Sequence, residues 1–195
     1  MRALPLDNPW ERFASPVPLS VYGMGARREF RWYFEGQSIV EIQSIEEIQD
    51  WLLGCQYASD PDLFQEDDFW QHPCTFEQLR KGDCEDFALW AWRKLVRLGY
   101  QAEFVAGHFR CSDTDHSHTW LPFEQDGALY LFDPSIREHR HMIRPLDAVC
   151  HDYIPEVSID QHFTRYVYAG YYLKRRREKP LIVRRPSPAA IVQAG

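Results

Sequence analysis

Cys84 stands in the segment Lys81-Gly-Asp-Cys-Glu-Asp-Phe87, at the start of a stretch whose apolar residues recur with helical spacing. We expect a helix to begin at Asp83 or Cys84 and to end at Leu98, just before Gly99. A helix N-terminus presents free backbone N–H groups and a partial positive charge, and both stabilise a thiolate. Those N–H groups can also hold the oxyanion of an acyl-transfer reaction. The position of Cys84 therefore predicts a nucleophile, with a small structural residue at a helix start as the alternative.

His118 and Asp133 lie in two strand-like segments, 118–123 and 128–133, which are joined by a hairpin signal at residues 124–127. A four-residue loop would place the two side chains directly opposite each other, and a two-residue Asp126-Gly127 loop would make them diagonal neighbours. An odd-numbered loop would put them on opposite faces. With an even loop, Asp133 can accept a hydrogen bond from one ring nitrogen of His118 and leave the other nitrogen for a thiol.

These segments carry a family resemblance. Gly82-Asp-Cys-Glu-Asp-Phe-Ala88, His118-Thr-Trp120 and Leu131-Phe-Asp-Pro134, preceded by Trp70 and Pro73, resemble the core of the transglutaminase-like superfamily, in particular the bacterial transglutaminase-like cysteine proteinases. The resemblance covers about residues 70 to 135. It implies a papain-like fold with a catalytic triad of Cys84, His118 and Asp133, in which the Cys lies on the helix and the other two on the sheet.

The activity expected from this resemblance is peptide or amide hydrolysis through a thioester acyl-enzyme, with a peptide or protein as the substrate. One alternative is acyl transfer of the transglutaminase or deamidase type on protein Gln, because hydrolysis and amine transfer share one acyl-enzyme. A second alternative is a binding module that retains the fold without catalysis. A third is a zinc site, since His108, Cys111, His116 and His118 are close in sequence, although their spacing matches no standard zinc finger.

The resemblance also suggests a second oxyanion donor and a metal site. Papain-like enzymes use a Gln side chain shortly before the Cys and transglutaminases use a Trp, so Gln78, Gln56 and Trp70 are the candidates. In the adhesin proteases of this family, acidic residues that flank the Cys bind calcium, and the residues that match them are Asp83, Glu85 and Asp86. Three carboxylates beside a thiolate disfavour its charge, and calcium would remove that conflict. Without calcium, the same carboxylates would simply interact favourably with the helix dipole.

The elements that must position these residues follow an α+β plan, with the Cys helix packed on an antiparallel sheet. We divide the chain into an N-terminal arm with one or two strands (1–43), a catalytic core (44–170) and a basic, flexible tail (171–195). The strands of the first part are expected within residues 28–42, where aromatic and β-branched residues are frequent. The core opens with a helix capped by Ser44, which forms a capping box with Glu47.

Charge and composition limit the partners of the chain. The net charge is −7, and residues 171–195 contribute +6, from seven basic residues and one acidic residue, so the remainder carries −13. This acidic body argues against nucleic acid as a partner, whereas the basic tail could contact an acidic one. No stretch approaches the roughly 20 apolar residues of a membrane span. The N-terminus has no signal-peptide pattern, and we therefore expect a cytoplasmic location. The five Cys are odd in number and irregularly spaced, which does not suggest a disulfide framework.

Overall fold

The computed structural model describes residues 8–111 and 114–172, so almost all of the predicted basic tail lies outside the described residues. A seven-stranded sheet forms the centre of the molecule, with the strand order β1-β9-β8-β4-β5-β6-β7. Every neighbouring pair in this sheet is antiparallel. In chain order the strands are β1 (Arg12–Ala14), β4 (Gln101–Cys111), β5 (Thr114–Gln125), β6 (Ala128–Phe132), β7 (Ile143–Pro145), β8 (Tyr153–Asp160) and β9 (Arg165–Tyr168).

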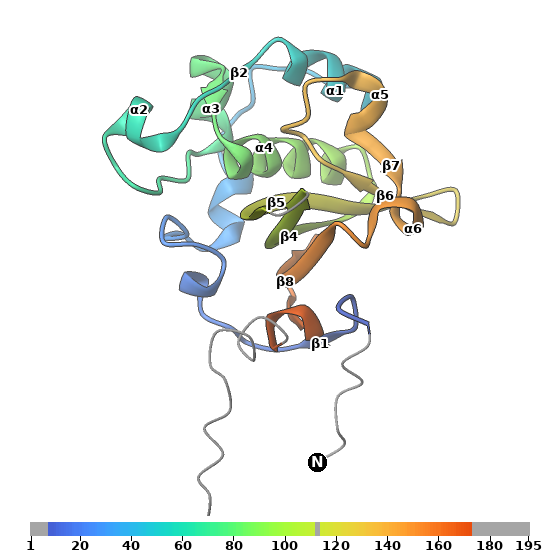
Figure 1. Ribbon diagram of the computed structural model, residues 1–195. Coiled ribbons are helices and arrows are strands. Elements are labelled where there is room, and N and C mark those ends of the chain that lie inside the picture. The colour runs from blue at the N-terminus through green and yellow to red at the C-terminus, as the bar shows by residue number, and fades with distance from the viewer. Residues whose placement is uncertain (1–7, 112–113, 173–195) are drawn as a thin grey trace, which may run out of the picture.

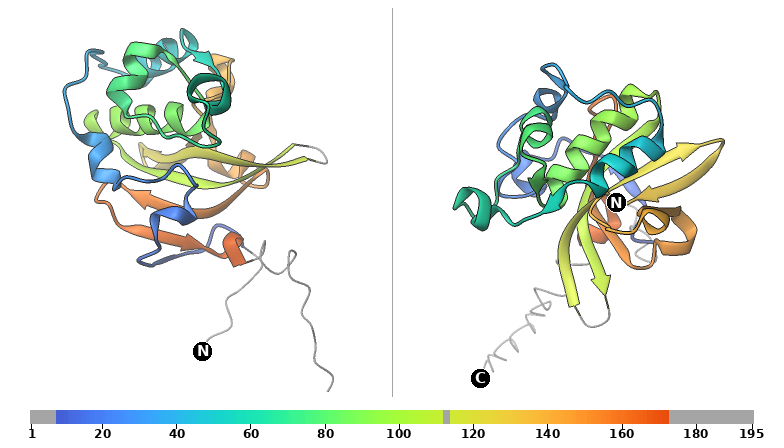
Figure 2. Two further views of the ribbon diagram at one scale, coloured as in Figure 1. Left: turned by 90° about the vertical axis from the view of Figure 1, so that its left-hand side faces the viewer. Right: turned by 90° about the horizontal axis from the view of Figure 1, so that it is seen from above.

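Helix α4 (Cys84–Arg97) packs across one face of the sheet, over β4 and β5 (Figure 1). Its side chains from Glu85 to Leu95 are all buried, because helices α1 (Ile45–Leu53) and α3 (Pro73–Leu79) pack against it in turn. The views in Figure 2 show these helices together on one side of the sheet. The arrangement confirms the α+β class expected from the order of helix and strands.

The structure confirms the predicted N-cap of α1 and the predicted start and end of α4. Ser44 caps α1 and accepts a hydrogen bond from the Glu47 backbone N–H at 3.3 Å. Helix α4 begins at Cys84, with Asp83 as its N-cap residue, and ends with Leu98 as its C-cap. Gly99 follows at φ +92°, a conformation that glycine adopts without strain. None of the helices within residues 8–111 and 114–172 is long and apolar enough to cross a membrane.

The strands expected within residues 28–42 do not form. This segment instead contains the 3₁₀ helix η2 (Phe30–Phe34), which buries Phe30 and Tyr33. Phe30 packs edge-on against Trp92 of α4, with ring centroids 6.1 Å apart. The three-residue spacing of Phe30 and Tyr33 places both rings on one side of a 3₁₀ turn, so their apolar character serves the core rather than a strand. The first strand lies earlier, at β1, where it pairs with β9.

The remaining elements lie around this two-layer centre. Helix α2 (Asp60–Phe64) precedes α3, and the short strands β2 (Gln56–Tyr57) and β3 (Lys81–Gly82) form a parallel bridge immediately before α4. Helices α5 (His139–Met142) and α6 (Leu146–Val149) flank β7, and the 3₁₀ helix η1 (Leu19–Val21) lies in the N-terminal arm. Trp10 and Val149 contribute to a second, smaller core that includes Trp120, Leu131 and Tyr153 of the sheet.

Candidate active site

The first turn of α4 carries the candidate nucleophile. Cys84 is the first residue of the helix, so its backbone N–H lies among those that have no partner within the helix. The chain enters the helix through Gly82, where any Cβ would collide with the side chain of Asp86. Because Gly82 has no side chain, strand β3, which pairs with β2, can lie directly against Asp86 in the first turn of α4.

The β5–β6 hairpin sets the relation between His118 and Asp133. Gln125 pairs with Ala128, so the loop consists of Asp126 and Gly127, and both adopt positive φ angles, 52° and 76°. This is the two-residue alternative of the sequence analysis, a turn whose twist matches that of the strands. It makes positions 118 and 133 diagonal neighbours on one face, and His118 Nε2 lies 2.8 Å from Asp133 Oδ2.

Asp133 is held from two sides by residues that sequence analysis did not identify. Ser135 donates to Oδ1 from its backbone N–H at 3.1 Å and from its hydroxyl at 2.7 Å. The Tyr153 hydroxyl donates to Oδ2 at 2.9 Å and itself accepts from Arg144 Nη2 at 2.9 Å. Burial raises the pKa of Asp133, but the charge of His118 and these hydrogen bonds outweigh it and hold the pKa below its ordinary value. The carboxylate therefore stays ionised and fixed in orientation.

The pKa of His118 shifts in the opposite direction, upward. Burial lowers its pKa, but the charge and hydrogen bond of Asp133, together with the interaction with Cys84, raise it to about 10. Its Nε2 is engaged by Asp133, which leaves Nδ1 as the ring nitrogen for the thiol. The rings of Phe109 and Trp120 lie beside the imidazole, with centroids 5.9 and 6.2 Å away, and limit its movement.

Cys84 and His118 both line a cleft of about 450 Å³ between the start of α4, the N-terminal arm and strands β4, β5 and β8. The Sγ atom of Cys84 lies 3.4 Å from Glu85 Oε2, so a carboxylate competes with the imidazole for the thiol proton. Of the three candidate oxyanion donors, Trp70 lines this cleft, whereas Gln78 and Gln56 are exposed at the end of α3 and on β2 and do not line it.

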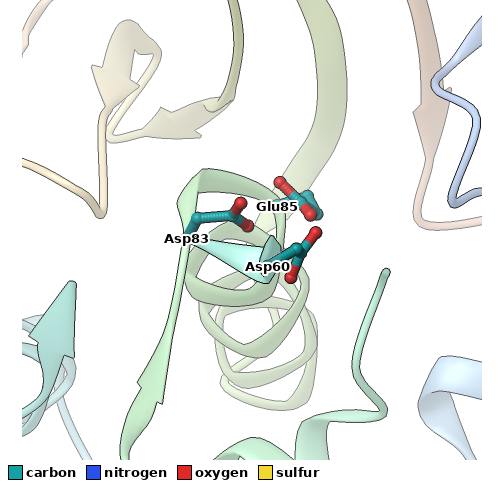
Figure 3. Close-up of side chains that lie close together, drawn as sticks. All are labelled: Asp60, Asp83 and Glu85. Atoms are coloured by element: carbon teal, nitrogen blue, oxygen red, sulfur yellow. The ribbon is translucent and has the colours of Figure 1, made fainter. Parts of the chain in front are cut away.

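Three carboxylates converge at the start of α4 (Figure 3). Asp60, Asp83 and Glu85 each bring one oxygen within 4.8 Å of the others. Asp60 Oδ1, Asp83 Oδ1 and Glu85 Oε1 are buried without a hydrogen-bond partner within residues 8–111 and 114–172. Burial and neighbouring carboxylates raise the pKa of Asp60 to about 6, and burial above all raises that of Asp83 and Glu85. Clustered oxygen ligands without donors fit a hard cation such as calcium.

This set differs from the predicted one. Asp86 is not one of the clustered carboxylates, and it accepts a hydrogen bond from the Gln71 backbone N–H at 2.7 Å and a further one from the Gln71 side chain. Consecutive residues in a helix point about 100° apart, so Glu85 and Asp86 do not face one ion together. Asp60 of α2 takes the third place, and its Oδ2 accepts from the Phe69 backbone N–H at 2.6 Å. Nothing in the local sequence around Cys84 points to Asp60.

The zinc alternative gains no geometric support. His108 lies 3.1 Å from Glu156, and His118 is engaged by Asp133. Among the residues whose side chains the structure describes, which exclude Cys111, no group of three or more His and Cys side chains lies at metal-binding distance.

Comparisons with known proteins give few matches. No protein-family model matches the chain, and no curated protein sequence matches it significantly. Among solved structures, Legionella pneumophila LapG in an EGTA-treated form is 24% identical with a TM-score of 0.45, over 58% of this chain and 60% of that chain. A calcium-bound form of LapG is 20% identical with a TM-score of 0.47, over 69% of this chain and 78% of that chain. Similarity at this level describes a partly shared chain path and assigns no family or activity to the chain.

Proposed function

We propose that this protein is a cysteine-dependent acyl-transfer enzyme of the papain-like, transglutaminase-like type that hydrolyses a peptide or amide bond. The observation that carries the proposal is the placement of three residues from distant parts of the chain. Cys84 begins α4, His118 shares its cleft, and Asp133 holds the far nitrogen of that imidazole at 2.8 Å. This is the arrangement by which a base activates a thiol and a third group orients the base.

The proposed reaction runs through a thioester. His118 takes the proton of Cys84, and the thiolate attacks the carbonyl carbon of the substrate. The backbone N–H of Cys84 and the indole N–H of Trp70 are the candidate donors to the resulting oxyanion. His118 then gives its proton to the leaving amine as the C–N bond breaks. Water, with His118 again as base, finally attacks the thioester, which releases the acid and restores the thiol.

We infer that Asp60, Asp83 and Glu85 hold a calcium ion when calcium is present. The orphaned buried oxygens and the raised pKa values of these carboxylates support this inference, because a cation would supply the charge that the described surroundings lack. Bound calcium would neutralise carboxylates that otherwise oppose a thiolate at Cys84.

Two alternatives use the same site. Acyl transfer to an amine would use the same Cys84 thioester and differ only in the acceptor that enters the cleft. A binding module would keep the fold and leave Cys84 unreactive. The network around Asp133, with Ser135, Tyr153 and Arg144, favours catalysis, because it orients a base in a way that binding alone does not require.

The test is labelling of the thiols with iodoacetamide and with an electrophilic peptide, followed by mass-spectrometric mapping, with and without calcium. Cys84 should be modified faster than Cys55 or Cys150, and His118→Ala should slow the reaction at Cys84 alone. Unlabelled protein should release fragments from a peptide library, and an added primary amine should appear on the products only if the enzyme transfers acyl groups. Equal reactivity of all thiols under both conditions would remove the enzyme assignment.

A further inference from the structure

Carboxylates predominate among the ionisable side chains that line the cleft over Cys84, although the raised pKa of His118 also places a cationic imidazole there. Among the described residues that line it there is no Lys or Arg, although the chain has 22 of them. Six carboxylates and two histidines supply its ionisable groups: Asp60, Asp67, Asp68, Asp83, Glu85, Glu156, His108 and His118. A cleft lined by one sign of charge focuses its field and attracts the opposite charge.

A metal ion in the cluster would not cancel this field. A divalent cation on Asp60, Asp83 and Glu85 leaves a residual charge of −1 there. Asp67 and Asp68 lie outside that group of ligands and line the same cleft. The cleft therefore remains acidic when a divalent cation occupies the cluster.

Two glycines of the N-terminal arm lie against Asp68. A Cβ at Gly23 would meet Asp68 Oδ2 at 3.1 Å and the Trp70 ring at 3.1 Å, and any Cβ at Gly25 would collide with Asp68 Oδ1. Both glycines thus make room for the Asp68 carboxylate beside Trp70. The negative charge of Asp68 also contributes to the raised pKa of Asp60 and Asp83, which places it next to the cluster.

The same cleft has an apolar rim. Val21 and Met24 line it, and Met24 is 72% exposed. An apolar surface beside carboxylates matches the side chains of Lys and Arg, which carry a charged end on an aliphatic stem. A purely apolar side chain would match only the rim, and an anionic side chain would be repelled by the carboxylates.

We propose that this cleft selects polypeptide substrates that carry Lys or Arg close to the scissile bond, with Asp67 and Asp68 as the carboxylates that recognise the cationic side chain. This inference rests on the proposed function, because it names the substrate class of the same site.

The experiment measures the charge preference of Cys84 without any turnover. Two methanethiosulfonates of similar size, one with a trimethylammonium group and one with a sulfonate group, are reacted with the protein in excess calcium. The thiolate attacks the reagent sulfur, a disulfide forms and methanesulfinate leaves. Mass spectrometry gives the rate constant at Cys84 for each reagent, and the ratio is divided by that of a small free thiol.

We expect the cationic reagent to be favoured at Cys84 by about tenfold or more over the free thiol, from the interaction of unit charges near a protein surface. The double variant Asp67→Asn/Asp68→Asn should lower that ratio about tenfold. Asp126→Asn removes a single negative charge in the β5–β6 turn, away from the cleft, so it is the matched control for Asp67→Asn alone and should leave the ratio within twofold. Should the double variant fail to fold, Asp67→Asn alone, at an exposed position, should lower the ratio by about threefold.

Matched peptides with Lys, Leu or Glu next to the scissile bond then test selection in turnover, and Lys peptides should show the highest kcat/KM. A reagent ratio equal to that of the free thiol, or unchanged in both Asp variants, overturns the inference even if peptides are cleaved. A high ratio with no cleavage of any peptide would instead refute the proposed function and leave the charge preference of the cleft standing.

Discussion

Replacing Asp60 by Asn tests the carboxylate cluster through stability. The change removes one negative charge and keeps the shape, and the Asn oxygen can still accept the hydrogen bond that Asp60 Oδ2 takes from the Phe69 N–H at 2.6 Å. Without a cation, burial and neighbouring carboxylates raise the pKa of Asp60 from 3.8 to about 6. Each pKa unit corresponds to about 1.4 kcal/mol, so ionised Asp60 destabilises the metal-free protein at pH 7 by about 2 to 3 kcal/mol.

The expected effect therefore changes sign with calcium. In a chelator at pH 7, Asp60→Asn should raise the free energy of unfolding by about 2 kcal/mol. In calcium at about 1,000 times the wild-type Kd it should be less stable than the wild type by up to about 2 kcal/mol, because calcium then stabilises the wild type by about 4.1 kcal/mol and the variant lacks one ligand.

The pH dependence follows from the same shift. Between about pH 4 and 6 the folded state binds more protons at Asp60 than the unfolded state, so the metal-free wild type should gain stability as the pH falls through 6. The Asn variant should gain less over that range, because Asp83 and Glu85 alone remain to take up protons.

Urea denaturation at several pH values, with EDTA and with calcium, provides the measurement. Asp62→Asn is the control, because Asp62 lies in the same short helix α2 but is exposed and accepts a hydrogen bond from Ser59 Oγ outside the cluster. The reasoning is refuted if Asp60→Asn destabilises the protein equally in EDTA and in calcium, or if the control shows the same change of sign.

Three further predictions concern the proposed catalytic residues and the sheet. Asp133→Asn should lower turnover about 10²- to 10⁴-fold and change the urea midpoint little, since its proposed role is to orient His118; loss of fold together with activity would contradict this. Tyr153→Phe removes one donor to Asp133, so the pKa of Asp133 should rise and kcat should fall by about tenfold, the size of one hydrogen bond to a charged group; NMR titration of the Asp133 carboxyl carbon and steady-state kinetics measure the two effects, and unchanged kinetics would exclude a positioning role. Gly107→Ala should cost about 2 kcal/mol or more, because a Cβ there collides with the Ile154 carbonyl oxygen and meets the Trp120 ring at 2.7 Å; Gly127→Asn, at an open position with φ +76°, is the control and should be nearly neutral in urea denaturation.

The parts of the site that the sequence predicts are those set by local rules. The start of α4 depends on residues within one turn of Cys84, and the hairpin relation depends on Asp126 and Gly127, which suit positive φ angles. Strand alternation then converts the loop length into a shared face for His118 and Asp133. These two local features predict the position of Cys84 at a helix start and the contact between His118 and Asp133. The expectation that the helix meets the hairpin came from the family resemblance.

The parts that sequence reasoning missed depend on contacts between distant segments. Asp60 reaches the cluster because α2 follows β2, which pairs with β3 immediately before α4. Tyr153 reaches Asp133 from the start of β8, two strands away from β5. Residues 30–34 show the converse error, since their apolar character matched a strand but serves the core as a 3₁₀ helix. In each case the missing information is which distant segment a residue packs against, and the spacing of apolar residues along the sequence does not contain it.

The geometry assigns opposite electrostatic roles to the two sides of Cys84. On the sheet side, Asp133 keeps His118 ready to carry a proton, and its own charge is stabilised by Ser135 and Tyr153 whether or not a cation is present. On the helix side, Glu85 Oε2 lies 3.4 Å from Sγ, within a cluster whose charge has no described counterpart. The sheet thus fixes the base, while the state of the carboxylate cluster sets the charge that the sulfur faces. A cation on Asp60, Asp83 and Glu85 would favour the thiolate by reducing that negative charge, without any movement of the proposed triad.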